Sequence, residues 1–257
     1  MARSFETRPV HLPEHQRPQD DEYYRRLNEL FSRSAGSNLD KLRAFPKFVP
    51  VAELGRFLAK SKIFERILTV PGSIVECGVY GGAGVMTWAA LSAILEPLNH
   101  VRRVIGFDTF EGFVAPGLKD ASASSNPAAV AGGLAADAAA EIADAAAIFD
   151  LYRPIGHIPK VELVKGDASQ TMPEYVERNP HLVVSLLYLD FDLYEPTRRA
   201  IEVFVQRMPR GAVIAFDQLN HRAWPGETMA LLETLGIRSL ALERLPFQPQ
   251  ISFAALQ

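Results

Sequence analysis

Five acidic residues recur at similar places in the chain, each within two residues of the end of a short apolar run. The runs are SIVEC at 73–77, RVIGF at 103–107, VELVK at 161–165, VVSLLYL at 183–189 and AVIAF at 212–216. The acids are Glu76, Asp108, Asp167, Asp190 and Asp217. Any one of them could cap the helix that follows, because aspartate is a preferred helix N-cap. Their recurrence favours a polar ligand site, since ligands of open parallel sheets bind outside the carboxyl ends of the strands.

The first acid is followed by a glycine-rich turn, GVYGGAG at 78–84. Glycine lets the backbone adopt positive φ and approach a ligand closely. The turn lacks the G-x-G-x-x-G spacing that cradles a dinucleotide phosphate. S-adenosylmethionine (SAM) has no phosphate and carries an ammonium, a sulfonium, a ribose and an adenine. The residues predicted to contact SAM are Glu76, Gly78, Tyr80, Gly81, Asp108, Thr109, Asp167 and Ala168.

Three of these acids have a predicted partner on SAM. Glu76 is placed to hold the ammonium group, directly or through water. Asp108 can accept both ribose hydroxyls, because a carboxylate has two acceptor oxygens. Asp167 is placed to reach the adenine amino group.

A second group of polar residues follows the fourth and fifth apolar runs. Neighbouring strands lie about 5 Å apart, so the loops after these runs should meet. Asp190, Asp217 and the carbonyl oxygen of Gln218 are predicted to bind Mg²⁺ or Mn²⁺, because hard cations prefer oxygen ligands. Asp190 is also predicted to be catalytic, and His221 is a competing candidate for the general base. In the alternative, the two aspartates cap helices or pair with nearby arginines.

The order of the elements predicts a Rossmann-like α/β domain over residues 38–257, after an N-terminal arm at 1–37 that is partly disordered or helical. Helices are expected at 51–68, 83–95 and 196–208. Apolar strands that alternate with helices indicate a mostly parallel sheet covered on both faces. The tail, from IRSLAL to QISFAAL, is expected to close the sheet as an antiparallel hairpin.

The stretch 113–158 interrupts this alternation of strands and helices. Its Ala-rich part, 134–152, is composed of good helix formers, whereas the Ser/Asn/Gly part before it is typical of a loop. An insertion after the second strand lies near the ligand edge of the sheet. It is therefore either a lid over the site or a surface helix with a long connection.

The composition limits the partners and the compartment. The net charge is −3, and no clustered basic face indicates a nucleic acid partner. No apolar run reaches the roughly 18–20 residues that span a membrane, and the first residues contain no signal-peptide core. The single cysteine, Cys77, excludes a disulfide within the chain and fits a reducing cytoplasm.

The segments around the strand-end acids are VECGVYGGAG, GFDTFEG, KGDASQTMP, YLDFDLYEPT and PRGAVIAFDQ. Together they resemble the macrocin O-methyltransferase family, whose members methylate sugar hydroxyls on macrolide and aminocoumarin antibiotics. The resemblance covers about residues 38–235. It implies a SAM-binding sheet, a divalent metal and homo-oligomers.

The family's site positions can be carried over residue by residue. They fall on Glu76, Gly78, Asp108 and Asp167 for SAM, and on Asp190 and Asp217 for the metal. The family commonly has two acids after the fifth strand, whereas the second position here is Gln218. An amide ligand is chemically reasonable, because catechol-type methyltransferases place an Asp-Asn pair there. The Ala-rich insertion is a further departure, and it leaves the acceptor open.

The sequence therefore predicts a SAM-dependent O-methyltransferase, assisted by Mg²⁺ or Mn²⁺, that acts on a hydroxyl of a natural-product or sugar-like small molecule. A metal-independent methyltransferase acting on a carboxylate or another acceptor is one alternative. An oxygenase of the cephalosporin hydroxylase type would need iron ligands, and His221 is the only obvious imidazole near the predicted site. A SAM-binding protein without catalysis is the third alternative, and the strand-end acids argue against it.

Overall fold

A computed structural model describes residues 17–120 and 126–257 of the 257-residue chain. Its contacts divide into two compact units, one ending at Arg56 and the other covering Phe57–Gln257. None of the helices within the described ranges is both long and apolar enough to cross a membrane.

The first unit is helical. It contains α1 (Pro18–Arg33), α2 (Asn38–Arg43) and a 3-10 turn, η2 (Phe45–Lys47). A capping box starts α2, because the Ser37 hydroxyl accepts the backbone N–H of Asp40 and the Asp40 carboxylate accepts that of Ser37. The arm predicted over residues 1–37 falls partly outside the described residues, and its boundary stays a prediction.

The second unit is built on one seven-stranded sheet in the order β3-β2-β1-β4-β5-β7-β6. The strands are β1 (Ser73–Cys77), β2 (Val104–Asp108), β3 (Val161–Lys165), β4 (Val184–Leu189), β5 (Val213–Phe216), β6 (Glu243–Leu245) and β7 (Gln248–Ala255). The first five are parallel, and β7 runs antiparallel to β5 and β6. Every residue of β1, β4 and β5 is buried, as expected for central strands covered on both faces. The predicted Rossmann-like class is confirmed.

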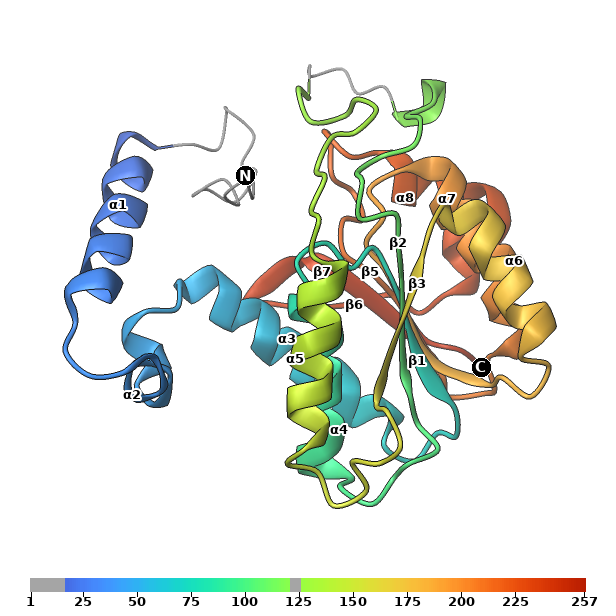
Figure 1. Cartoon of the computed structure of the whole chain (residues 1–257). Coiled ribbons are helices and arrows are strands. Elements are labelled where there is room, and N and C mark those ends of the chain that lie inside the picture. Colours follow the sequence, from blue (N-terminus) through green and yellow to red (C-terminus); the bar gives the residue numbers. More distant parts are fainter. Residues whose placement is uncertain (1–16, 121–125) are drawn as a thin grey trace. The chain divides into compact units, whose positions relative to one another are not determined.

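Helices cover both faces of this sheet (Figure 1). They are α3 (Val51–Ile67), α4 (Ala83–Leu95), α5 (Ala139–Asp150), α6 (Ala168–Arg178), α7 (Tyr194–Phe204) and α8 (Gly226–Thr234). One apolar core joins α4, α5 and the second half of α3 to the sheet. The other core joins α6, α7 and α8 to the opposite face. The sheet is thereby fixed between two packed layers, which makes it a rigid support for the loops at its edges.

Two predicted elements need correction. The first strand of the closing hairpin was expected in IRSLAL, but Ile237–Ser239 is a 3-10 turn and the strand is β6, Glu243–Leu245. Leu240 and Leu242 pack on the apolar core as part of the connection and do not enter the ladder. The Ala-rich helix is also shorter than the stretch of good helix formers at 134–152. It begins at Ala139 and ends at Asp150 as α5.

Buried cations brace the end of the sheet where the parallel strands begin. The Arg102 guanidinium donates to the carbonyl oxygens of Ile67 and Val70 at 3.0 and 2.9 Å, which satisfies the C-terminal end of α3. The Lys160 ammonium donates to the carbonyl oxygens of Asn99 and Arg102 at 2.7 and 2.9 Å. These bonds join α3, β2 and β3 at the edge opposite to the strand-end acids, so we assign them to stability.

Candidate functional site

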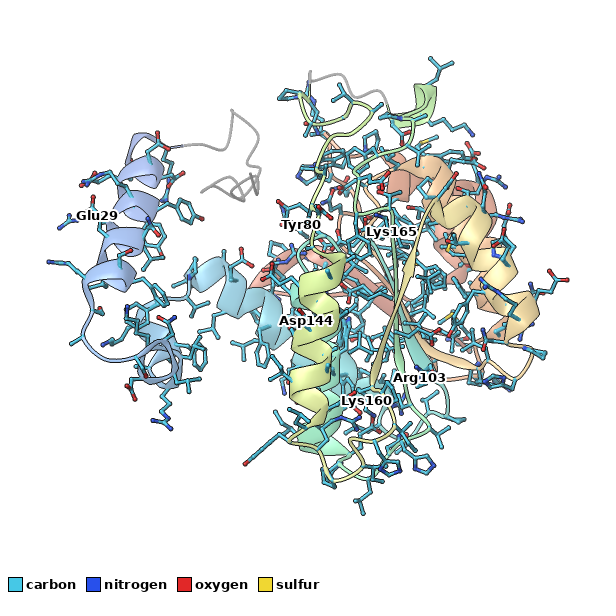
Figure 2. All side chains as sticks on the ribbon, in the orientation of Figure 1. Glu29, Tyr80, Arg103, Asp144, Lys160 and Lys165 are labelled. Carbon is cyan, nitrogen blue, oxygen red and sulfur yellow. The ribbon has the colours of Figure 1, made fainter. Side chains whose placement is uncertain are left out.

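The strand-end acids lie along one edge of the central sheet. β3, β2, β1, β4 and β5 are parallel neighbours in that order, so their carboxyl ends share this edge. The chain passes outward from β1 to β3 and then returns to β4 on the other side of β1. Ligands of open α/β sheets bind at such a reversal. In Figure 2, Tyr80 and Lys165 mark this edge, and Arg103 and Lys160 mark the opposite one.

The glycine-rich turn after β1 is held tightly against the loop after β4. Gly78 has a φ of +94°, and a Cβ atom there would lie 2.0 Å from the carbonyl oxygen of Asp190. The backbone N–H of Asp190 donates to the carbonyl of Cys77 at 2.8 Å, which extends the β1–β4 pairing into both loops. Only glycine fits at residue 78, because the conformation and the close approach both exclude a side chain. Tyr80 and Gly81, at the tip of the turn, are exposed.

Glu76 is buried in β1, directly below this turn. Its carboxylate lies against the first turn of α4, since a Cβ atom on Gly84 would be 1.8 Å from its Oε1 atom. The N-terminus of a helix carries partial positive charge and therefore favours a carboxylate. The predicted contact of Glu76 with the ammonium group of SAM stays a prediction.

The carboxylate of Asp108, at the end of β2, clamps the glycine-rich turn. Its Oδ2 atom accepts the backbone N–H groups of Val79 and Tyr80 at 2.7 and 2.9 Å, and Oδ1 accepts that of Phe110 at 2.7 Å. A carboxylate has about four lone-pair sites, so Oδ1 can still accept from a ligand. Asp108 therefore has a structural role that the sequence does not reveal. Its predicted contact with the ribose stays a prediction.

The other predicted SAM contacts hold the turns in which they lie. The Thr109 hydroxyl donates to the carbonyl of Gly112 at 2.7 Å and accepts the N–H of Glu111 at 3.0 Å. Asp167 caps α6, because its carboxylate accepts the N–H of Ser169 at 2.9 Å. Ala168, the first residue of α6, is buried. The structure brings these residues to the same edge, and their contacts with SAM stay predictions.

Three carboxylates gather at the other side of this edge. They belong to Asp190 directly after β4, Asp192 in the same loop, and Glu227 in the first turn of α8. One oxygen of each lies within 4.8 Å of the others, a spacing that suits a divalent ion. We call these three residues the acidic trio. Carboxylate oxygens are the ligands that Mg²⁺ and Mn²⁺ prefer, so the donor set fits such an ion.

Glu227 is the most deeply buried member of the acidic trio, with no exposed surface. Burial raises the pKa of its carboxyl well above the usual value, and the negative charges of Asp190, Asp217 and Asp192 raise it further. Its Oε2 atom accepts the backbone N–H of Gln218 at 3.0 Å. Its Oε1 atom accepts no hydrogen bond from any described residue. A buried carboxylate with an unsatisfied oxygen is costly, and a bound cation would offset that cost.

The metal ligands predicted from the sequence lie on the neighbouring ends of β4 and β5. Asp217 is buried and accepts a hydrogen bond from the Tyr188 hydroxyl. The side-chain oxygen of Gln218 is buried and accepts none from the described residues. Of the predicted ligands, only Asp190 belongs to the acidic trio. The set of Asp190, Asp217 and Gln218 stays a prediction.

Sequence reasoning missed two members of the acidic trio. Asp192 repeats the acid two residues after Asp190, and the sequence LDFDL contains that signal. Glu227 follows no apolar run, so the rule that located the other acids could not find it. Its position depends on how α8 packs.

His221 lies in the turn between β5 and α8. Its carbonyl oxygen accepts the backbone N–H of Trp224 at 3.2 Å, which folds this turn back on itself. The role of His221 as a general base stays a prediction.

The insertion at 113–158 is anchored to the loops of this edge. Asp120 is buried and accepts the backbone N–H of Tyr194, at the start of α7, at 2.6 Å. Phe113 packs edge-on against Trp224 in the turn before α8, with ring centroids 5.6 Å apart.

The helix of the insertion contacts the glycine-rich turn. A Cβ atom on Gly82 would lie 2.6 Å from the side chain of Ile142, which α5 buries in the core. The Ala-rich helix is thus a packed element of the fold. Residues 121–125 of the predicted lid loop, 121–134, lie outside the described residues, and the lid role stays a prediction.

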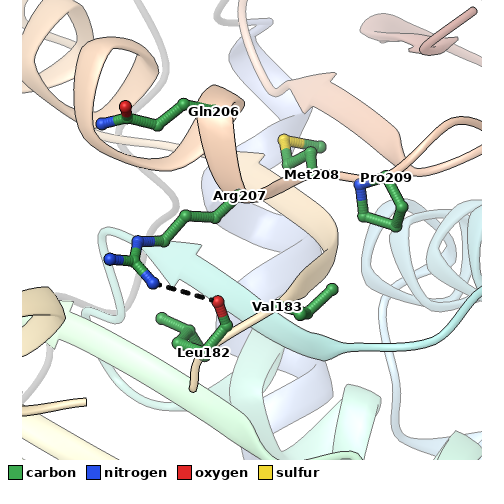
Figure 3. Close-up of a pocket in the computed structure, with 6 residues that line it drawn as sticks. All are labelled: Leu182, Val183, Gln206, Arg207, Met208 and Pro209. Atoms are coloured by element: carbon green, nitrogen blue, oxygen red, sulfur yellow. Dashed lines mark hydrogen bonds between the residues drawn. The ribbon is translucent and has the colours of Figure 1, made fainter. Parts of the chain in front are cut away.

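A surface groove occurs at the opposite end of β4 and β5 (Figure 3). It is lined by Leu182, Val183, Gln206, Arg207, Met208 and Pro209. The Arg207 guanidinium is used within the fold, because it donates to the carbonyls of Pro180 and Leu182 at 3.1 and 3.3 Å. This groove lies where the strands begin, so the strand-end acids do not reach it.

Comparison with known proteins agrees with this geometry. The family model described as macrocin O-methyltransferase (TylF) matches residues 58–231. The crystal structure of CalS11, a calicheamicin methyltransferase, is 32% identical, with a TM-score of 0.89 over 94% of each chain. The apo structure of CalS11, described as a TDP-rhamnose 3'-O-methyltransferase, has a TM-score of 0.81 over 94% of this chain and 96% of the other.

A more distant solved structure shares the fold. The O-methyltransferase NovP is 20% identical, with a TM-score of 0.61 over 79% of this chain and 80% of the other. No curated protein sequence matches the chain.

The close approach at Gly78 can be tested by comparison with a glycine that has no close neighbour. Gly236 also has positive φ, +73°, but a Cβ atom there would meet nothing within 4 Å. Gly236→Ala should therefore cost only the strain of a backbone conformation that L residues rarely adopt, about 1–3 kcal/mol in the free energy of unfolding. Gly78→Ala should cost roughly 3 kcal/mol more, the upper end for overpacking. Urea denaturation of both variants measures the difference, and equal losses would contradict the assigned contact.

Proposed function

The chain belongs to the macrocin O-methyltransferase family, and on this premise we propose that it transfers the methyl group of SAM to a sugar hydroxyl. One observation carries the choice of acceptor. CalS11, described as a TDP-rhamnose 3'-O-methyltransferase, is 32% identical over 94% of the chain. The proposed acceptor class is therefore a sugar hydroxyl, either on a nucleotide-linked sugar or on a glycosylated natural product.

The donor half of the site is formed by the glycine-rich turn and the acids beside it. Glu76 would bind the ammonium group of SAM, and Asp108 would accept from the ribose while it clamps Val79 and Tyr80. Asp167 would lie toward the adenine. Fixing the donor in this way lowers the entropic part of the barrier, because the sulfonium methyl is already oriented when the acceptor arrives.

The acceptor half lies at the loops after β4 and β5. In the proposed step the acceptor oxygen attacks the methyl carbon in line, and the bond between that carbon and sulfur breaks. The sulfonium becomes the neutral thioether of S-adenosylhomocysteine (SAH), and the hydroxyl proton passes to a base. Asp190 is the proposed base, because it lies at the switch point between the two halves, and His221 is the alternative.

A divalent metal is the second part of the proposal. The buried acids around Asp190 support it, since their donor atoms suit Mg²⁺ or Mn²⁺. Such an ion, when bound, lowers the pKa of a coordinated hydroxyl near the methyl donor. Asp190, Asp217 and Gln218 are the ligands proposed from the sequence.

The ribose contact of Asp108 can be separated from its clamping role by a double-mutant cycle. SAH and an analogue without the two ribose hydroxyls are titrated into the wild type and Asp108→Asn by calorimetry. If Asp108 binds the hydroxyls, their removal should cost the wild type roughly 1.5–3 kcal/mol per bond and cost the variant much less. Additive losses would mean that Asp108 only holds the glycine-rich turn.

Removal of the metal tests the acceptor chemistry. With labelled SAM and a panel of TDP-linked deoxysugars, aglycones and carboxylates, we expect methylation of a sugar hydroxyl. EDTA should abolish turnover, and Mg²⁺ or Mn²⁺ should restore it. SAH affinity should survive chelation, because the donor contacts lie on other strands. Full turnover after exhaustive chelation, or transfer to carboxylates alone, would favour the metal-independent alternative.

The assembly and compartment are also proposed. Exposed apolar side chains in the first unit include Leu39, Leu42 and Val51, which are 67%, 58% and 82% exposed. Such a group of side chains favours a homo-oligomer. The single, buried Cys77 fits a reducing cytoplasm.

Light scattering after size-exclusion chromatography tests the oligomer. The wild type should elute as a dimer or larger, and Leu42→Ser with Val51→Ser should shift it toward a monomer because the covered apolar surface is lost. Leu151→Ser, at a leucine outside the first unit that is 87% exposed, is the control and should have no effect. A monomeric wild type would contradict the proposal.

A further inference from the structure

The first turn of α8 is pressed against the loop after β4. A Cβ atom on Gly226 would lie 2.4 Å from the backbone nitrogen of Tyr194 and 2.6 Å from the carbonyl oxygen of Asp192. Glycine at this position allows the helix to begin within van der Waals distance of that loop. The next residue, Glu227, is thereby placed beside Asp190 and Asp192, although it is 35 or more residues away in sequence.

Only one of the two carboxylate oxygens of Glu227 accepts a hydrogen bond from the described residues. One oxygen accepts the Gln218 backbone N–H, whereas the other is buried without a hydrogen-bond donor among the described residues. The carboxylate to which that oxygen belongs is one of three that each offer a ligand atom within 4.8 Å of the others. Buried acceptors are almost always satisfied in folded proteins, so an unsatisfied one surrounded by acids indicates a missing cation.

We infer that Glu227 is a metal ligand in this chain and that the acidic trio of Asp190, Asp192 and Glu227 holds the divalent ion. This inference rests on the proposed metal-assisted methyl transfer and assigns its ligands differently. Gln218, on the loop after β5, offers a neutral oxygen. Glu227 supplies from α8 the negative charge that this loop lacks at residue 218. Asp217 accepts from Tyr188 and is not one of the three clustered carboxylates, so we place it next to the ion's ligands and outside the set.

Charge explains why Glu227 is the better ligand. An ion with two positive charges, buried among acids, is stabilised more by a carboxylate than by an amide, because the Coulomb attraction is strong where water is excluded. The ion in turn removes the repulsion among the three carboxylates. Occupation of the site and burial of Glu227 therefore stabilise each other.

Metal binding to the full-length chain tests this assignment without relying on activity. Metal-free protein with SAH bound is titrated with Mn²⁺, followed by calorimetry and by the electron paramagnetic resonance of free Mn²⁺. Glu227→Gln keeps the size of the side chain and should weaken Mn²⁺ binding by about tenfold or more, because loss of even a group that only orients a metal ligand typically costs about that much. SAH affinity should not change. Glu227→Asp, which keeps the charge on a shorter stem, should retain more affinity than Glu227→Gln.

Glu233→Gln is the matched control. Glu233 lies on the same helix but is exposed and pairs with Lys119, so its loss should leave Mn²⁺ affinity unchanged. Melting temperatures give a second measurement. In EDTA, Glu227→Gln should be as stable as the wild type or more stable, since it removes like charge from a buried cluster. With Mn²⁺, the rise in melting temperature should be smaller than in the wild type.

Two outcomes would overturn the assignment. Wild-type Mn²⁺ affinity in Glu227→Gln, combined with its loss in Gln218→Leu and Asp217→Asn, would return the ion to the ligands proposed from the sequence. Methyl transfer would then still depend on metal, so the proposed function would stand. A wild type that binds no Mn²⁺ and is fully active in EDTA would overturn both the assignment and the metal in the proposed function.

Discussion

The contact between Gly78 and the backbone of Asp190 is the constraint on which the site depends. It brings the turn after β1 and the loop after β4 to a separation that no side chain tolerates, with a virtual Cβ only 2.0 Å from the facing carbonyl. In the proposed reaction, the turn after β1 belongs to the donor half of the site and the loop after β4 to the acceptor half. Because methyl transfer needs both reactants in line at short range, the fixed separation of these loops would then set the geometry of the reaction.

Around this contact, the carboxylates of the proposed donor half accept hydrogen bonds from backbone N–H groups of the protein itself. Asp108 accepts three backbone N–H groups from the glycine-rich turn and its own loop, and Asp167 caps α6. The acceptor half is different, because Glu227 keeps a buried oxygen that the described residues leave unsatisfied. In the proposed site, the protein's own hydrogen bonds prepare the first half, and a cation would complete the second. Asp108 and Asp167 therefore differ from Glu227, because backbone N–H groups satisfy the first two and leave one oxygen of Glu227 unsatisfied among the described residues.

The Ala-rich insertion contributes to the same edge through its ends. Asp120 binds the start of α7, Phe113 packs on Trp224, and Ile142 packs on Gly82. These contacts tie the insertion to the loops after β4, β5 and β1 in turn. A segment that interrupts the alternation of strands and helices therefore contacts three of the loops at the edge that carries the strand-end acids.

The sequence by itself determined the sheet and its chemical edge, because both follow from local patterns. Apolar runs with acids at or near their ends located β1 to β5 to within one residue, and the glycine-rich turn marked a close backbone approach, which the structure places against the loop after β4. Tertiary structure alone decided the position of Glu227, since it depends on how α8 packs against a loop formed more than 30 residues earlier. The position of the edge strand β6 could not be predicted from the sequence either. IRSLAL has the composition of a strand, but in the structure it forms a connection that packs on the core. Periodicity and strand-end rules report local backbone preference, whereas the acidic trio arises from long-range packing that no local pattern encodes.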